Sequence, residues 1–282
     1  MKIAVLLTTF NRKEKTVACL QSLRAQKLPP NVELEVFLTD DASADGTVTA
    51  VKNVYPEAHV FHGTGSLYWA GGMRNTWRQA TQHKPDFYLL LNDDTVLNED
   101  AIETLLNNCV VQDKGETDTI CIGSTCDNHS GEISYGGWKL AARGRWKSSR
   151  IHSSTAFMDC DFGNANIMLV PHTVVEKIGI LADHFTHSLA DYDYTLKAKK
   201  AGFRVQVAPG FLGSCVDDHG RNWKSSNTTL KERIQYLKSP KGLAYKEYLR
   251  FIRDHFPLSY PSAFIKLWMK TFFPFIWDTL KK

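Results

Sequence analysis

The sequence predicts an α/β fold built on a mostly parallel, doubly wound sheet. Short apolar runs alternate along the chain with segments whose apolar residues recur at helical spacing. Polar residues crowd the positions that directly follow the apolar runs, where an open α/β sheet binds its ligands. The 282 residues suffice for one or two domains with a sizeable core.

The first hundred residues contain four strand-like runs separated by helical patterns. The expected strands are 3–7, 34–38, 58–61 and 87–91, and the expected helices are 13–26, 47–54 and a segment carrying Met73, Trp77 and Ala80. Helices that connect successive strands in this way produce parallel pairing.

The alternation of strand-like and helical segments ends after residue 100. A helix carrying Ile102, Leu105, Leu106 and Cys109 leads to a glycine-rich stretch over 131–146 that predicts hairpins or loops. Pro171 should open a helix that Gly179 closes, and a second helix should begin near Asp191 and end at Gly202.

Charge is distributed unevenly along the chain. Residues 221–282 contain 13 Lys and Arg against 4 Asp and Glu, whereas the chain as a whole has a formal net charge of only +4. An acidic body with a basic, aromatic end argues against a nucleic-acid-binding protein. No long apolar run or export signal is visible, and the six cysteines form no CxxC pair, so we expect a reduced, cytoplasmic protein.

Two pairs of carboxylates follow neighbouring strands. Asp40 and Asp41 come after the second strand, and Asp93 and Asp94 come after the fourth. Each pair alone could be an ordinary turn or N-cap. Together they repel one another unless a cation offsets the charge, and Mg²⁺ or Mn²⁺ with a diphosphate fits that need. The first turn contains no glycine and no phosphate-binding GxxxxGK[ST] loop occurs, which excludes the common dinucleotide and P-loop sites.

Five motifs in order resemble the family 2 glycosyltransferases over roughly residues 2–220. They are TTFNR at 8–12, DDASADGT at 40–47, WAGGM at 69–73, LLNDD at 90–94 and ADYDY at 190–194. The resemblance implies a GT-A fold, a nucleotide-diphosphate sugar donor, a divalent cation and inversion at the anomeric carbon. It also implies a catalytic domain over 1–220, with a donor half of about 1–100 and an acceptor half of about 101–220, followed by a helical extension over 221–282.

The resemblance assigns most of the donor site to the strand ends. Asp41 corresponds to the aspartate that binds the pyrimidine base, which favours a UDP- or dTDP-sugar, and glycines 71 and 72 would let the backbone approach the nucleotide. The expected nucleotide-sugar-binding residues are Thr8, Phe10, Asn11, Arg12, Asp41, Gly71, Gly72, Arg74, Asn92 and Asp93.

Asp94 matches the metal-binding end of the family's DxD motif, although the first position here is Asn92. His219 resembles a downstream histidine that some GT-A enzymes add as a metal ligand, although it could equally be an ordinary loop residue.

Asp191 corresponds to the family's catalytic base, at a helix N-terminus whose dipole favours an ionised carboxylate. Asp193 is the substitute if the register differs by two, and it is a weak candidate for binding the acceptor. Trp69 and Trp138 could stack on sugar rings or simply belong to the core.

The sequence thus predicts an inverting, metal-dependent glycosyltransferase of the hexosyl or deoxyhexosyl class that acts on a glycan or lipid-linked acceptor in polysaccharide biosynthesis, and an oligomer is possible. The alternatives are a sugar nucleotidyltransferase and a non-catalytic nucleotide-sugar-binding subunit. Residues 262–282, placed on one helix, would separate Lys266 and Lys270 from Ile265, Trp268, Phe272, Phe275 and Ile276. Such a helix could hold the enzyme on the inner face of the cell membrane or pack on protein.

Overall fold

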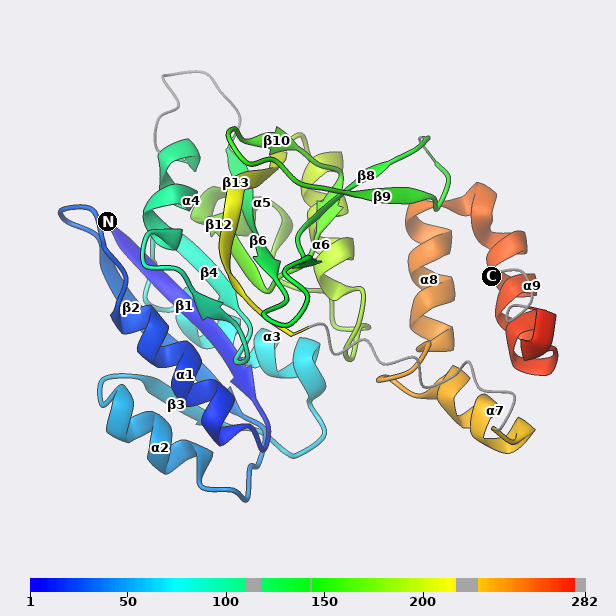
Figure 1. Ribbon diagram of the computed structural model, residues 1–282, viewed down its shortest axis with the longest axis horizontal. Helices are drawn as coiled ribbons and strands as arrows, with labels where there is room; N and C mark the ends of the chain where they lie inside the picture. Colours follow the sequence, from blue (N-terminus) through cyan, green and yellow to red (C-terminus); the bar gives the residue numbers. More distant parts are fainter. Residues whose placement is uncertain (110–117, 143, 217–227, 277–282) are drawn as a thin grey trace.

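A computed structural model describes residues 1–109, 118–142, 144–216 and 228–276 (Figure 1). A large twisted sheet with helices on both faces forms the body, and three further helices lie to one side of it. The predicted α/β class and the helical C-terminal part are therefore confirmed.

The first half of the sheet is parallel, as the alternating pattern predicts. Its elements are β1 (Lys2–Thr9), α1 (Lys13–Arg24), β2 (Glu33–Asp40), α2 (Thr47–Val54), β3 (His59–His62), α3 (Tyr68–Thr81) and β4 (Phe87–Leu91). Strand β1 pairs in parallel with β2 and β4, and β2 pairs in parallel with β3. The carboxyl ends of β1, β2 and β4 consequently meet at one edge of the sheet.

The second half makes the sheet mixed. It contains β5 (Val96–Leu97), α4 (Ala101–Cys109), β6 (Thr119–Cys126), β10 (Met158–Asp159), β12 (Ile167–Pro171), α5 (His172–Ile178), α6 (Ala190–Lys200) and β13 (Arg204–Ser214). The strand order is β10-β13-β6-β12-β4-β1-β2-β3. Strand β12 runs antiparallel to both β4 and β6. The start of β12 therefore lies beside the end of β4, a neighbour that sequence periodicity does not identify.

The glycine-rich stretch forms short strands, as expected. Strand β7 (Ile133–Tyr135) extends the main sheet, while β8 (Gly137–Leu140), β9 (Ser148–Ile151) and β11 (Phe162–Gly163) make a separate three-stranded sheet. In Figure 1 this small sheet reaches from the body toward the C-terminal helices.

The C-terminal helices are α7 (Leu230–Lys238), α8 (Tyr245–His255) and α9 (Tyr260–Phe272), with the short 3-10 helix η1 (Pro257–Ser259) before α9. The expectation of one helix over 262–282 is wrong in length, because α9 stops at Phe272. Pro274 follows within two residues, and its ring and missing N–H are incompatible with continuing the helix.

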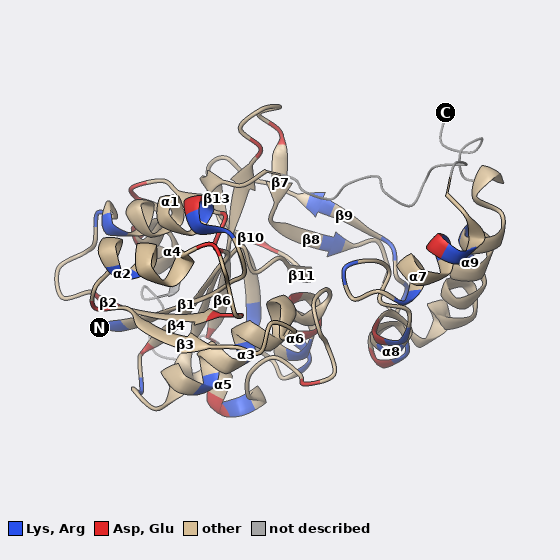
Figure 2. Cartoon of the chain, turned by 90° about the horizontal axis from the view of Figure 1, so that it is seen from below, with Lys and Arg blue, Asp and Glu red and all other residues tan. Residues whose placement is uncertain are grey.

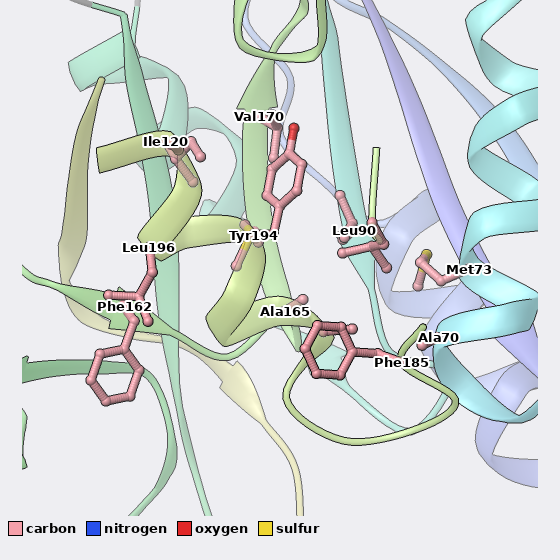
Figure 3. Close-up of a cluster of buried hydrophobic side chains, with 14 of the residues drawn as sticks. Ala70, Met73, Leu90, Ile120, Phe162, Ala165, Val170, Phe185, Tyr194 and Leu196 are labelled. Carbon is pink, nitrogen blue, oxygen red and sulfur yellow. The ribbon is translucent and has the colours of Figure 1, made fainter. Parts of the chain in front are cut away.

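One apolar core runs through the body and into the C-terminal helices. Helix α3 contributes Met73 and helix α6 contributes Tyr194, and these side chains gather against one face of the sheet around Leu90 (Figure 3). The same cluster includes Phe251 of α8 and Leu267 of α9. The C-terminal helices are thus held by burial of apolar surface continuous with the core.

Close packing of α3 on β1 depends on one glycine. A Cβ atom at Gly72 would lie 2.0 Å from the hydroxyl oxygen of Thr8, whereas one at Gly71 would lie 3.2 Å from the nearest atom of Leu67. Only the first position requires α3 or β1 to move.

We expect Gly72→Ala to lower the free energy of unfolding by about 1–3 kcal/mol, the usual cost of overpacking. Gly71→Ala is the matched control, because a helical alanine gains up to about 1 kcal/mol over glycine and its neighbour needs to give only slightly. Urea unfolding of both variants measures the difference. Equal stability of the two would contradict the packing argument.

Candidate active site

The ends of β1 and β4 bring opposite charges together. Arg12 lies 2.7 Å from a carboxylate oxygen of Asp94 and 3.3 Å from one of Asp93. Lys15 approaches Asp94 at 3.9 Å. Arg12, expected to contact the donor, is therefore also a counter-ion for the predicted metal-binding carboxylates.

Asp93 and Asp94 have the character of a cation site. Burial raises the pKa of Asp93 to about 6, with Arg12 opposing this shift and Asp94 adding to it. Among the described residues, the Asp93 Oδ2 atom is buried and has no hydrogen-bond partner. A hard divalent ion would give this oxygen a partner, so the residues fit the expected Mg²⁺ or Mn²⁺.

The residues around the pair are engaged with one another. Asn92 accepts a hydrogen bond from the Trp69 indole N–H at 2.8 Å, which orients its amide oxygen toward the protein. The Cys215 thiol lies 3.5 Å from Asp94 and 3.6 Å from the Asn166 amide. His219 lies outside the described residues.

The loop after β2 contacts both the loop after β1 and the start of α3. Asp41 is 4% exposed, and its carboxylate accepts hydrogen bonds from the backbone N–H groups of Gly65, Leu67 and Tyr68. Asn11 connects the two loops by accepting from the Ala44 N–H at 2.8 Å. Asp41 thus holds the start of α3, an additional structural role for the residue expected to bind the base.

The remaining donor-site candidates divide into two groups. Thr8 packs under Gly72, and Phe10 is 44% exposed at the end of β1. Arg74 requires a correction: its guanidinium donates to the carbonyl oxygens of Ala182 and Phe185, at 2.9 and 2.7 Å. It is buried against the loop before α6 and holds that loop in place.

Asp191 occupies the first turn of α6, as predicted, and is partly exposed. Its oxygens accept hydrogen bonds from the backbone N–H groups of Tyr192 and Ala165, at 2.9 and 3.2 Å. Burial raises the pKa of Asp191 to about 6, although these hydrogen bonds act in the opposite direction. A carboxylate with this pKa is suited to accept a proton near neutral pH.

Residues 164–166 connect the two carboxylate groups. Ala165 donates to Asp191, while the carbonyl oxygen of the next residue, Asn166, accepts from the Asn92 N–H at 3.1 Å. Asp191 therefore lies one short segment of backbone away from the Asp93–Asp94 pair.

Trp138 lies on the Asp191 side of the site. Its ring stacks on Phe162 with 6.2 Å between centroids, and the Arg150 guanidinium lies over the ring, 4.9 Å from its centroid. Figure 2 shows the basic positions of β8 and β9 in this small sheet. The Trp138 indole N–H lies 3.5 Å from the Asn164 amide oxygen, and Asn164 also donates to the Tyr192 hydroxyl.

Asp193 is not placed to contact an acceptor, which corrects that prediction. It is 2% exposed and accepts from the His255 Nε2–H at 2.8 Å, with the Lys197 ammonium 2.7 Å away. Burial alone would raise the pKa of Asp193, but His255 and Lys197 outweigh it and hold the pKa below its usual range.

Helix α8 also supports the loop that precedes Asp191. Glu247 accepts from the N–H and the hydroxyl of Thr186, at 3.0 and 2.6 Å. Sequence reasoning missed Glu247, His255 and residues 164–166, because none carries a short motif and their partners are distant in the chain. The run Gly-Asn-Ala-Asn at 163–166, just before an apolar strand, was the only local signal.

Comparisons with known proteins identify the family and the fold. The family model for glycosyl transferase family 2 matches residues 4–146. A mannosyltransferase from Pyrobaculum calidifontis, solved with GDP-Man and Mn²⁺, superposes with a TM-score of 0.52 at 16% identity, covering 84% of this chain and 61% of its own. The Staphylococcus aureus protein TarS 1–349, solved with UDP-GlcNAc, superposes with a TM-score of 0.57 at 16% identity, covering 90% of this chain and 73% of its own.

A curated relative, GalNAc(5)-diNAcBac-PP-undecaprenol beta-1,3-glucosyltransferase of Campylobacter jejuni, is 25% identical over 126 residues. The match spans 40% of each chain. The fold is therefore that of the GT-A glycosyltransferases. The chain itself belongs to glycosyl transferase family 2, since the family model covers half of it.

We expect Asp193→Asn to lower the free energy of unfolding by about 2–3 kcal/mol at pH 7. Removing one partner of a fully buried pair costs about 3–5 kcal/mol, and the 41% exposure of Lys197 reduces this. Because the pKa of Asp193 is lowered in the folded protein, its contribution is present above about pH 4 and is lost as the pH falls further. Urea unfolding at pH 7 and pH 3.5 measures both effects. A constant difference between variant and wild type would contradict the ion-pair interpretation.

Proposed function

We propose that this chain is an inverting, metal-dependent glycosyltransferase that moves a hexosyl or deoxyhexosyl group from a UDP- or dTDP-sugar to a hydroxyl of a glycan or lipid-linked saccharide. The observation that carries the proposal is the bridge formed by residues 164–166 between Asp191 and the Asp93–Asp94 edge. An acceptor hydroxyl beside Asp191 would then face a donor whose diphosphate lies at Asp94.

Asp191 serves as the base in this proposal. Its carboxylate is held by two backbone N–H groups at a helix N-terminus, so it stays oriented while it removes the acceptor's proton. Proton removal makes the hydroxyl oxygen a better nucleophile as it attacks the anomeric carbon opposite the departing nucleotide. Trp138 lies next to Asn164 with Phe162 and Arg150 against its ring, so stacking on an acceptor sugar would require the Arg150 guanidinium to move aside.

In this proposal Asp94 and Asp93 would hold the cation, with His219 as an additional ligand. The bound cation supplies positive charge to the donor's diphosphate and to the leaving nucleotide. Arg12 neutralises the carboxylates in the free protein, and donor binding would release its guanidinium toward the phosphates.

Asp94→Ala should abolish transfer, and chelation should weaken donor binding, because the diphosphate and the two carboxylates would then share only Arg12 and Lys15 as counter-charges. Isothermal titration of UDP and dTDP with Mn²⁺, with and without EDTA, measures binding separately from activity. Lys13→Ala is the control, since this lysine pairs with exposed Glu14 outside the Asp94 cluster. Full transfer activity in excess EDTA would exclude a metal-dependent reaction.

Asp191→Asn should lower kcat by about 10²–10⁴, the usual contribution of a general base, while leaving donor affinity unchanged. In the wild-type protein, kcat/KM should fall about tenfold per pH unit below about pH 6, as the base becomes protonated. The residual kcat/KM of the Asp191→Asn variant should lack this decrease below about pH 6. A wild-type profile that is flat from pH 5 to pH 8 would remove Asp191 from the role of base.

We also propose that the C-terminal helices hold the enzyme on the inner face of the cell membrane. Helix α9 and the residues after it expose a group of apolar side chains, here called the apolar patch: Phe264, Ile265, Phe272, Phe273 and Phe275, each 41–59% exposed. Trp268, expected on the same surface, instead packs on Tyr245 and donates to its hydroxyl.

The basic charge of 221–282 suits an anionic surface, and a polyprenyl-diphosphate acceptor like the one in the curated relative's name would lie there. Across the described ranges, which omit 277–282, every helix is too short or too polar to span a bilayer.

The double variant Ile265→Glu with Phe275→Glu should reduce co-sedimentation with anionic vesicles several-fold at low salt. Met158→Glu is the matched control, because Met158 is exposed on β10, remote in sequence from the patch. Point variants are preferable to truncation, since α9 buries Ala263 and Leu267 in the core. Equal sedimentation of both variants and wild type would leave the patch without a role in membrane binding.

A further inference from the structure

Three ligating side chains converge far from the Asp94 site. Glu35 of β2 lies 2.8 Å from the Nε2 atom of His59 in β3 and 2.9 Å from the Nδ1 atom of His83, which follows α3. The three ligand atoms all lie within 4.8 Å of one another. One carboxylate oxygen thus faces two imidazole nitrogens from different parts of the chain.

Strand register explains why these residues meet. His59 pairs with Phe37, and Glu35 is two residues before Phe37 on the same face of β2. That face is covered by α3, whose Met73 and Trp77 pack in the same cluster as Phe37. The chain leaves α3 at Thr81, which brings His83 over the same spot.

The site is separate from the donor edge. Glu35 lies five residues before Asp40 on β2, a distance of about 16 Å along the strand. An ion held there could not contact a diphosphate at Asp94.

The geometry needs little change to hold an ion. Bonds of about 2.0–2.1 Å in a tetrahedral site place neighbouring ligand atoms about 3.3 Å apart, so the present contacts would open by about half an ångström. Phe37 fixes both imidazoles, stacking on His59 at 4.7 Å and meeting His83 edge-on at 4.9 Å.

The surroundings leave the three side chains accessible to an ion from solvent. The three side chains are 34–39% exposed, which leaves room for water as a further ligand. An open groove beside them is lined by Glu33 and Glu57 as well as by Lys2.

We propose that Glu35, His59 and His83 bind one transition-metal ion of the Zn²⁺ class. Two imidazole nitrogens and one carboxylate select Zn²⁺, Co²⁺ or Ni²⁺ over Mg²⁺, which prefers oxygen ligands. The ion would join β2, β3 and the end of α3. This inference is independent of the proposed glycosyl transfer.

The test uses the full chain in about 5 mM Mg²⁺, so that sites with oxygen ligands are occupied by a different ion. A millimolar concentration is needed because Mg²⁺ binds weakly to protein oxygens. We expect one equivalent of Zn²⁺ to bind by calorimetry and Co²⁺ to give visible absorption bands. His59→Ala and His83→Ala should each weaken Zn²⁺ binding by about 10–100-fold or more.

Two controls separate this site from others. His62→Ala removes another histidine of β3 at the opposite end of the strand, and Asp94→Ala removes the proposed donor-site ligand; both should retain Zn²⁺ binding. Metal-free urea unfolding confirms that each variant is folded, as expected for half-exposed side chains. Zn²⁺ binding that survives both His59→Ala and His83→Ala, or that is lost in Asp94→Ala, would overturn the proposal.

Discussion

The position of β12 between β4 and β6 is the constraint on which the candidate site depends. Because β12 runs antiparallel to β4, its first residues lie beside the carboxyl end of β4, where Asp93 and Asp94 begin. The residues just before β12 can then bond to Asn92 on one side and Asp191 on the other. A parallel strand in that position would place these residues at the opposite edge of the sheet.

Three aspartates of the candidate site and its surroundings differ in how their charge is compensated. Asp93 and Asp193 are buried and Asp191 is partly exposed, and the neighbours of each shift its pKa differently. Burial dominates at Asp93 and Asp191 and raises the pKa of both, whereas His255 and Lys197 lower that of Asp193. The first two are suited to exchange a cation or a proton, and the third is suited to hold α8 against α6.

The fold could be predicted where structure is local. The apolar periodicities placed α2 over Thr47–Val54 and the boundary signals placed α5 between Pro171 and Gly179, both as found. Asp191 at a helix N-terminus was predictable from the same pattern. Arg74 and Asp193 were not, because their partners, Ala182 and His255, are 108 and 62 residues away. Register and burial decide such contacts, and a single sequence encodes neither in a short motif.

The hydrogen bonds between Glu247 of α8 and the loop before Asp191 have a consequence for recombination between relatives. The family model ends at residue 146, yet Asp191, its backbone partners and the Glu247 and His255 contacts all lie beyond it. A chimera that takes the loop before Asp191 and α6 from one relative must therefore take α8 from the same relative. A crossover placed between them would join a loop from one parent to a support shaped for another.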